Sequence, residues 1–554
     1  MSARVWRRLA CLAVLVMVAT SCSANSRDQF ADQGGFVRVG STEIVHNFNP
    51  WTSDDTLVLE LESDIYPRLV QYDLKTMEFE PDFASRWSTS ADGKTWTFHT
   101  RPDAEWSDGR PLTAADVAWT IDTVIRLKHG AASLWAGAVA GAVSAKALDA
   151  TTVRVTYTHA TAGVLADLQQ LPVLPEHVWA PYAAGTGKEL RGVSNTPTSG
   201  HPIVSGGPFT FVKYTYQEAV LFQRNPHYYG TAPHIAGFGV ELFSSDDALV
   251  AAMRAGEIDG TTGNPSIPPT DIRPLQDAHL HIIGRPALSY SDIIINTNPK
   301  KVGHRELLDP AVREALEYAT DRASIIKIAY LGFATPGSSI VPPATGKWYD
   351  PAVKPLPFDL TKANELLDQA GYARGPGGIR IADGHQMAYT MLISEDNGGE
   401  GLRTGQILAA DYAKIGIKLT PQQTDDDTLN DALIHDHYRT FDLGMWGWDT
   451  LVDPTYILDA MTCSQWYDNS DSGYCNSTYD QLYHQQLVET NLKKRRAIVY
   501  QMQKMVADDR PYIVTNYLKS MEAWNSRFSD VVEGPDGWFS AFSASPQLTI
   551  RLSD

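Results

Sequence analysis

Two periods of apolar and polar residues alternate along this chain, which predicts strands and helices in turn and a mixed α/β fold. Thr95 to His99 set Trp96 and Phe98 between polar neighbours. This period of two is typical of a half-buried strand. Apolar runs predict four further strands, at Phe36 to Val39, Phe209 to Lys213, Ile293 to Ile295 and Ile417 to Leu419.

Residues that favour helix ends mark the predicted helices. Thr113 can cap a helix whose third position holds Asp116, while Leu112 can pack against Val117. Proline fits the first position of a helix, where no amide donor is needed. The other helices are predicted from Asp246 to Gly256, where the Asp246-Asp247 pair is expected to cap, from Asp309-Pro310 onward, and from Leu402 to Lys414, stopping at Gly416.

The N-terminus has the pattern of an export signal. Basic residues precede an apolar run from Leu9 to Ala19, and small residues then lead to Cys22. The run is shorter than the roughly 20 apolar residues that span a bilayer. Cys22 resembles the acylated cysteine of a bacterial lipobox; the alternative is ordinary secretory cleavage with Cys22 incidental. We expect a signal peptide over 1–21 and a lipid-anchored tether over 22–35, on the outer face of the bacterial cell membrane (the periplasmic side).

Charge, length and cysteines narrow the class of protein. The formal net charge of −19 argues against nucleic acid as a partner. A chain of 554 residues exceeds what one core usually supports, so two or three compact units are expected. Cys463 and Cys475 are the only pair after the leader and its cut site, and in an exported chain such a pair predicts a disulfide.

Three blocks in register resemble one known family. They run from Pro81 to Trp87, from Asp92 to Phe98 and from Trp106 to Val117. These blocks resemble the extracellular solute-binding proteins of family 5, the receptors of peptide, oligopeptide and nickel importers. Further matches follow in the family's order: Ser205 to Phe209, Asn225 to Tyr229, Ala255 to Asp259, Asp309 to Leu316 with Ala319 to Arg322, and Trp448 to Pro454 with the Cys463 to Cys475 loop.

The resemblance implies a two-lobed periplasmic-binding-protein-like α/β fold (type II, three-domain, cluster C type) with the ligand cleft between the lobes. Lobe 1 would comprise a core domain of residues 36–64, 200–295 and 520–554 and an inserted subdomain of residues 65–199. Lobe 2 would comprise residues 296–519, with hinges near Asn296 and near Pro511 to Lys519. The implied partners are a peptide or peptide-like solute and ABC permease subunits, for a monomer held to the membrane by its lipid anchor.

Solute contact is implied first for one stretch, Trp446, Gly447, Trp448 and Asp449. In peptide-binding relatives an Asp after this Gly-Trp accepts the α-ammonium group, as a charge-assisted hydrogen bond. Relatives place that Asp four residues before the proline, where this chain has Thr450, so Asp449 is one residue out of register. The two tryptophans share one side of an extended segment, with Gly447 opposite, and either line the cleft or pack into the lobe. Asp453 is expected to cap the turn at Pro454.

A second docking segment is implied around Leu59 and Glu60, although a helix on the lobe surface explains the same pattern. Dipeptide receptors of the family fix the ligand carboxylate with an Arg in the region resembling Leu392 to Gly401. This chain has none there, and its nearest, Arg403, is expected on a solvated helix face. The absence favours longer peptides or a non-peptide solute over a strict dipeptide receptor.

Other functions are weighed against peptide capture. The pair His435 and His437 lacks a third ligand with suitable spacing, so no metal or cofactor is expected. Haem, nickel-chelate and oligosaccharide solutes stay open, as does a regulatory lipoprotein that has lost transport. We expect no enzyme activity, because the chain has neither a G-x-S-x-G elbow nor an H-E-x-x-H motif.

Overall fold

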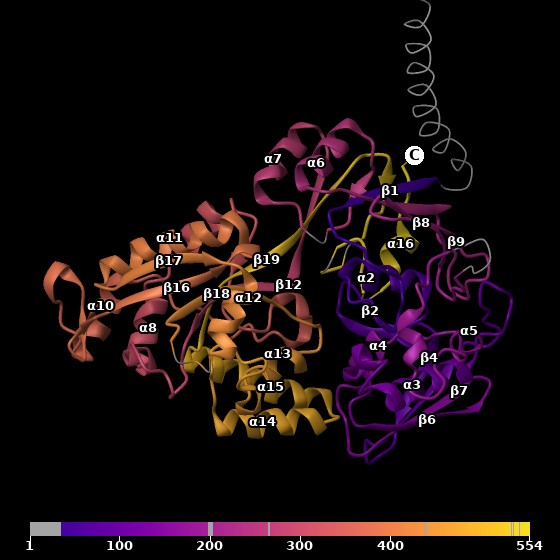
Figure 1. Ribbon diagram of the computed structural model, residues 1–554, viewed down its shortest axis with the longest axis horizontal. Coiled ribbons are helices and arrows are strands. Elements are labelled where there is room, and N and C mark those ends of the chain that lie inside the picture. The colour runs from indigo at the N-terminus through magenta and orange to yellow at the C-terminus, as the bar shows by residue number, and fades with distance from the viewer. Residues whose placement is uncertain are drawn as a thin grey trace, which may run out of the picture.

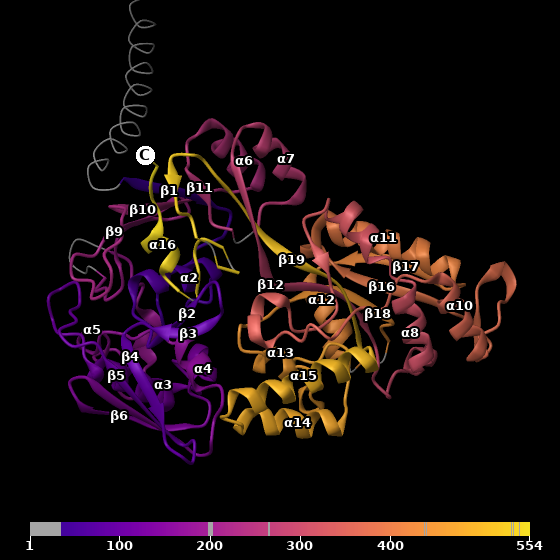
Figure 2. The same cartoon turned by 180° about the vertical axis from the view of Figure 1, so that it is seen from behind.

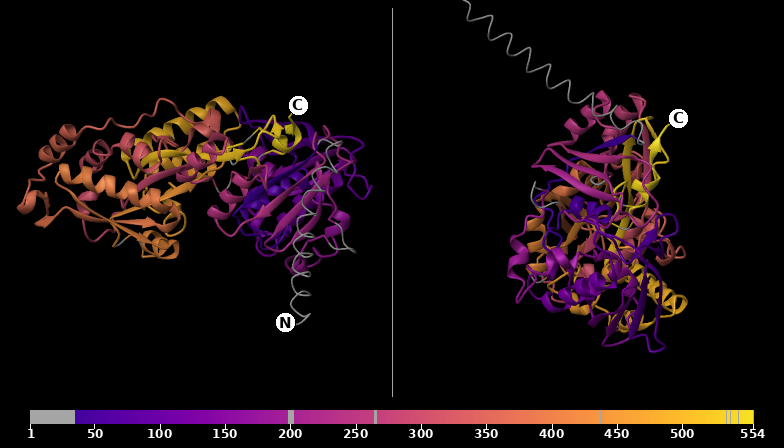
Figure 3. Two further views of the ribbon diagram at one scale, coloured as in Figure 1. Left: turned by 90° about the horizontal axis from the view of Figure 1, so that it is seen from above. Right: turned by 90° about the vertical axis from the view of Figure 1, so that its right-hand side faces the viewer.

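Two lobes lie end to end along the long axis of the molecule (Figures 1 and 3). The computed structural model describes residues 35–553 except 198–202, 264–265, 437, 439, 533, 536 and 542. The expected leader, Cys22 and His437 lie outside the described residues. Within the described part of the chain, no helix is both long and apolar enough to cross a membrane.

One eleven-stranded sheet runs through both lobes in the order β17-β16-β18-β12-β19-β11-β1-β10-β9-β8, with β13 (Thr335–Pro336) on β19. The strands of lobe 1 are β1 (Phe36–Ser41), β8 (Phe209–Thr215), β9 (Ala219–Arg224), β10 (Gly237–Leu242) and β11 (Gly260–Thr261). Those of lobe 2 are β16 (Ala388–Ser394), β17 (Lys418–Thr424) and β18 (Leu443–Asp449). The sheet therefore joins the lobes as well as forming their cores.

The strands β12 (His281–Ile295) and β19 (Tyr512–Trp524) pass between the lobes side by side, as Figure 2 shows from behind. Their antiparallel pairing starts with His281 opposite Trp524 and ends with Ile294 opposite Tyr512. The register shifts between Pro286 and Tyr290, at the middle of β12. A second shift follows between Ser291 and Asp292, so the connection is a paired ribbon with two irregularities.

The remaining elements cover this sheet or extend it. Lobe 1 adds a four-stranded sheet, β4 (Ala84–Thr89), β5 (Thr95–Thr100), β7 (Thr152–Tyr157) and β6 (Ala142–Asp149), the hairpin β2 (Val70–Asp73) and β3 (Glu78–Pro81), and the C-terminal pair β20 (Phe528–Ser529) and β21 (Arg551–Leu552). Its helices are α2 (Thr56–Ile65), α3 (Ala114–Leu127), α4 (Val164–Gln170), α5 (Glu176–Trp179), α6 (Asp246–Ala255), α7 (Pro269–Asp277) and α16 (Ser545–Thr549). Lobe 2 has α8 (Pro310–Tyr318), α9 (Arg322–Ser324), α10 (Leu360–Gln369), α11 (Gly398–Lys414), α12 (Asp426–Asn430), α13 (Thr455–Asp459), α14 (Ser477–Val488), α15 (Leu492–Asp509) and the small hairpin β14 (Ile381–Ala382) and β15 (His385–Gln386).

Helix starts follow the capping residues of the sequence. At α3 the Thr113 hydroxyl and the Asp116 carboxylate form the expected capping box. Asp309 caps α8, with Pro310 in its first turn. At α6 the expected pair Asp246-Asp247 lies in the first turn, and the cap is Ser245, which accepts from the Ala248 amide. The capping prediction for that pair was wrong by one residue, because Ser245 is the last extended residue before the helix.

The lobes also meet away from the crossing strands. An apolar cluster joins Tyr72 and Met77, from the β2–β3 hairpin of lobe 1, to Leu288 and Val452, all four buried. At the far edge, the Ala162 amide donates to the Leu487 carbonyl at 2.9 Å. Lys347 of lobe 2 also forms an ion pair with Glu78 of β3. The described contacts between lobe 1 and lobe 2 therefore include the ribbon, the apolar cluster, this ion pair and the edge beside α14.

Candidate functional site

A cavity of about 450 Å³ opens on lobe 2 where β18 ends. Its lining combines aromatic rings with two carboxylates, two amides and an imidazole. Its lining residues are Asn430, Ile434, His435, Trp446, Gly447, Trp448, Asp449, Tyr456, Asp468 and Asn469. All four residues of the stretch that the sequence singled out are thus brought together around one space.

Trp446 and Trp448 point to the same side of β18, and one carboxylate accepts a hydrogen bond from each of them. Their indole N–H groups donate to Oδ2 of Asp471, at 3.0 and 3.2 Å. Tyr512 donates its hydroxyl to the other oxygen of Asp471. The two rings meet edge to face with centroids 6.2 Å apart. Both tryptophans therefore line the cavity and also pack into the lobe. The two roles that the sequence left as alternatives occur together.

Asp471 was not predicted from the sequence. It lies in the loop closed by the Cys463–Cys475 disulfide, which the structure contains as expected. Burial raises the pKa of the Asp471 carboxyl to about 6, although the hydrogen bonds from Tyr512 and the two tryptophans lower it. The disulfide pattern marked the loop, but nothing in the sequence marked which of its polar residues turns inward.

A second buried carboxylate, Asp292, lies on β12 opposite Trp446. Neither of its carboxylate oxygens has a hydrogen-bond partner among the residues that the structure describes. Burial raises the pKa of Asp292, and the nearby Asp471 raises it further. The floor beneath the tryptophans therefore holds two carboxyl groups that disfavour each other's ionisation.

Asp449 is exposed at the end of β18 and lines the cavity. Its Oδ1 accepts a hydrogen bond of 2.5 Å from the hydroxyl of Ser289, its partner across the strand pair. A hydroxyl on one oxygen leaves the carboxylate capacity to accept from a cationic group in the cavity. Asp468 is the other carboxylate of the lining.

Gly447 lies between the tryptophans on the opposite side of the strand, as predicted. A Cβ atom there would come within 2.7 Å of the Tyr290 carbonyl oxygen on β12. That carbonyl belongs to the backbone of the neighbouring strand and cannot turn aside. Gly447 is therefore required for the close approach of β18 to β12, which sets the position of its two neighbours.

The structure does not bring the other predicted site residues to this cavity. Leu59 and Glu60 lie on α2 in lobe 1, where Glu60 is buried, and neither lines the cavity. Arg403 lies on α11 with 37% of its side chain exposed, as expected of a solvated helix face, and its guanidinium donates to Oε1 of Glu400 at 2.5 Å and to the Ala329 carbonyl. His435 lines the cavity and is hydrogen-bonded to Asp431 at 2.7 Å.

Asp453 caps the turn after Pro454, as predicted, by accepting from the Thr455 amide at 3.0 Å. It also forms a buried two-pronged ion pair with Arg495 of α15, at 2.6 and 2.7 Å. The ion pair ties the chain that follows β18 to the helical face of lobe 2.

Comparison with known proteins agrees with this architecture. A model of the bacterial extracellular solute-binding proteins, family 5, matches residues 78–469. Heme-binding protein A of Haemophilus influenzae is 24% identical over 501 residues, 87% of this chain and 86% of the relative. The dipeptide-binding protein of Escherichia coli is 25% identical over 514 residues, 88% of this chain and 90% of the relative.

The solved structure of a periplasmic binding protein, DppA from Helicobacter pylori in complex with the peptide STSA, has the same fold. The TM-score is 0.70 at 22% sequence identity, over 94% of this chain and 98% of that one. The fold and family are those of solute-binding transport proteins, which are not enzymes. The match to the family model covers well over half of the sequence, and the chain belongs to the family 5 solute-binding proteins of ABC importers.

Proposed function

We propose that this protein captures oligopeptides in a cleft between its lobes, against the cavity beside Trp446 to Asp449, and delivers them to a membrane permease. The observation that carries the proposal is the exposed carboxylate of Asp449 at a cavity of about 450 Å³. A carboxylate beside two indole faces suits a group that is both cationic and attached to an apolar chain. A peptide N-terminus has this character.

The composition of the stretch Leu392 to Gly401 supports a solute longer than a dipeptide. It holds no arginine, and the nearby Arg403 is already paired with Glu400. The ligand carboxylate therefore has no fixed cationic partner in this stretch, which leaves the chain length of the solute unrestricted at that end. Acylation of Cys22 would hold the receptor at the outer face of the membrane, close to its permease.

Native mass spectrometry of the protein purified without its leader and Cys22 tests the proposal. After denaturation, the released molecules are identified by mass. We expect a ladder of peptides, whose shortest member gives the minimum length directly. A protein that releases nothing and binds no member of a peptide library would contradict peptide capture and favour the regulatory alternative.

A non-peptide solute with a bound metal is the second candidate, because His435 contributes an imidazole to the same lining. Imidazole is a common ligand of iron and nickel. One relative is named for binding haem. In the same experiment, release of a single porphyrin or metal-chelate mass, lost in His435→Ala, would replace the peptide with this solute and keep the transport role.

A further inference from the structure

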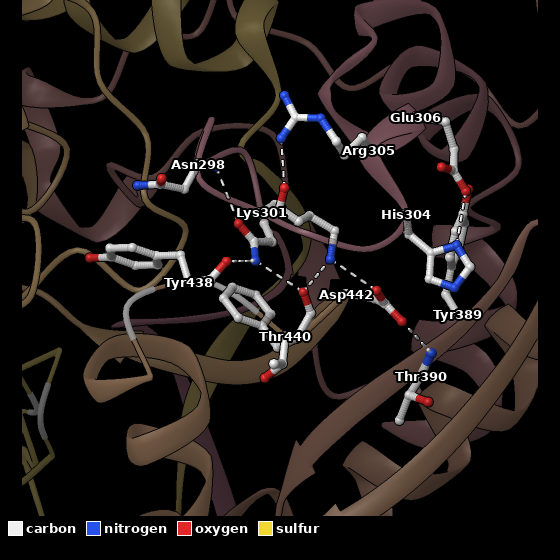
Figure 4. A network of polar contacts seen from close by, with 12 residues as sticks. Asn298, Lys301, His304, Arg305, Glu306, Tyr389, Thr390, Tyr438, Thr440 and Asp442 are labelled. Atoms are coloured by element: carbon white, nitrogen blue, oxygen red, sulfur yellow. Dashed lines mark hydrogen bonds and ion pairs between the residues drawn. The ribbon is translucent and has the colours of Figure 1, made fainter. Parts of the chain in front are cut away.

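Two histidines and one glutamate meet on lobe 2, at the turn that precedes α8. His304 and Glu306 belong to that turn, and His385 comes from the β14–β15 hairpin. Figure 4 shows the His304 ring turned toward Glu306, beside Tyr389 of β16. In the part of the chain that the structure describes, this is the one group of three or more His, Cys, Asp or Glu side chains close enough to share a metal ion.

The geometry of the group matches a small coordination sphere. Nδ1 of His304 lies 3.0 Å from Oε1 of Glu306, and Nε2 of His385 lies 3.3 Å from Oε2. The three ligand atoms all lie within 4.8 Å of one another. Bonds of about 2.0–2.2 Å in a tetrahedral zinc site place neighbouring ligand atoms about 3.3–3.6 Å apart. The two contacts with Glu306 are already close to this spacing, and the two imidazole nitrogens lie within 4.8 Å of each other, so rotation of the two partly exposed imidazoles would let the three donors surround an ion.

Neighbouring side chains orient the Glu306 carboxylate, and its ion pairs are with the two histidines. Tyr389 donates its hydroxyl to Oε1 of Glu306 at 3.1 Å, the kind of outer contact that orients a metal ligand. The buried cation Lys301 forms its ion pair with Asp442 instead, at 2.9 Å (Figure 4). The other oxygen of Asp442 accepts from the Thr390 amide. Lys301 therefore does not form an ion pair with Glu306, and the Glu306 carboxylate keeps its contacts with the two histidines.

The three side chains differ in solvent exposure, as expected for an ion with one coordination position open to water. The Glu306 side chain is 1% exposed, whereas His304 is 24% and His385 is 41% exposed. The carboxylate thus forms the floor, and solvent reaches the two imidazoles. Both α8 and β16 lie in lobe 2, away from lobe 1 (Figure 1), and none of the three residues lines the cavity beside Asp449.

We propose that His304, Glu306 and His385 bind one Zn²⁺ or a similar divalent transition metal, with water as the fourth ligand. Two imidazoles and one carboxylate bind such transition-metal ions in preference to Ca²⁺ or Mg²⁺, which favour oxygen ligands. The ion would fasten the β14–β15 hairpin to the start of α8. This site is separate from the solute cavity and does not depend on the solute's identity.

Zinc titration of the leaderless protein, carrying no histidine tag and dialysed against EDTA, tests the site. We expect one high-affinity Zn²⁺ per chain by isothermal titration calorimetry, and a rise in melting temperature on adding zinc. His385→Ala should lower the affinity by more than about 100-fold, because loss of even an outer contact costs about 10–100-fold. Tyr389→Phe removes such an outer contact and should fall within that smaller range.

A matched control is His129→Ala, which removes an exposed histidine near the end of α3 and should leave zinc binding unchanged. Equal melting temperatures of His385→Ala and wild type in EDTA would show that the fold is intact. The proposal is overturned if the wild type binds no zinc, or if His385→Ala binds it as tightly as the wild type does. The second result would place the ion elsewhere on the chain.

Discussion

The carboxylate of Asp449 is the residue on which peptide recognition is expected to depend. Its substitution by asparagine keeps the shape and the contact with Ser289 but removes the charge. A hydrogen bond to a charged group contributes about 1.5–3 kcal/mol. We therefore predict that Asp449→Asn weakens binding of free-amine peptides by about 10–100-fold and spares N-acetylated ones, measured by calorimetry.

Asp468→Asn is the matched comparison, because Asp468 is the other carboxylate of the same lining. It should change the affinity for free-amine peptides much less. If Asp468→Asn alone discriminates between free and acetylated peptides, the ammonium group binds at Asp468. Equal losses for both kinds of peptide in Asp449→Asn would remove Asp449 from that role.

Asp471 makes a prediction about pH. Because burial raises its pKa from 3.8 to about 6, the folded protein holds this proton more tightly than the unfolded chain does. Its contribution to stability is therefore full below pH 4 and is lost as the pH rises through 6, a change of about 3 kcal/mol. Relative to wild type, Asp471→Asn should gain that amount of unfolding free energy between pH 3.5 and 7. Urea unfolding at several pH values measures the difference, and a difference independent of pH would contradict the prediction.

At the scale of elements, the loop between Cys463 and Cys475 supports the cavity from behind. A disulfide closing a loop of this size stabilises by about 3 kcal/mol in the chain-entropy model. Cys463→Ser/Cys475→Ser should lower the unfolding free energy by about that amount and also weaken solute binding, because Asp471 of the loop fixes both tryptophans. Denaturant unfolding and calorimetry measure the two effects. A loss of stability with unchanged solute affinity would mean that the loop does not position the tryptophans.

Elements with local signals were predictable, and those set by distant contacts were not. The capping box of α3 and the Asp-Pro start of α8 were confirmed, because capping depends on neighbours in sequence. The apolar run Ile293 to Ile295 was predicted as a short strand, whereas it is only the end of the fifteen-residue β12. The first half of β12 includes the exposed residues Gly284, Arg285 and Pro286, which interrupt any apolar alternation, and its strand conformation comes from pairing with β19.

At the scale of the whole molecule, Met77 tests how the lobes are held together. Its side chain, 6% exposed, belongs to the apolar cluster that includes Leu288 and Val452 of the other side. The backbone φ of Met77 is 53°, a conformation that asparagine adopts more readily, so Met77→Asn should fold. Removing this apolar burial, worth about 1.5–3 kcal/mol, should open the solute-free protein and weaken solute binding about 10–100-fold.

Small-angle X-ray scattering measures the opening as a larger radius of gyration without solute. Tyr216→Asn is the control, because Tyr216 is 68% exposed and its loss should leave both quantities unchanged. An unchanged radius of gyration and affinity in Met77→Asn would mean that the apolar cluster does not contribute to holding the lobes.

The sequence identified lining residues of the cavity, but not the buried carboxylates that lie next to its tryptophans. Trp446 to Asp449 could be singled out because a family motif passes through them. Asp292 and Asp471 lie 179 residues apart and meet only in the folded lobe, so no local pattern could pair them. The same holds for His385, whose approach to His304 depends on the hairpin before β16.

The paired crossing of β12 and β19 has a mechanical consequence. Two free loops would let the lobes swivel in any direction, but a ribbon whose strands share backbone hydrogen bonds resists sliding and lengthwise stretching. Such a ribbon yields most easily by changing its twist, and that twist is least constrained at the two register shifts, between Pro286 and Tyr290 and between Ser291 and Asp292. We therefore expect the lobes to rotate mainly about the long axis of this ribbon, with the angle at rest set by the apolar cluster around Met77 as well as by the backbone.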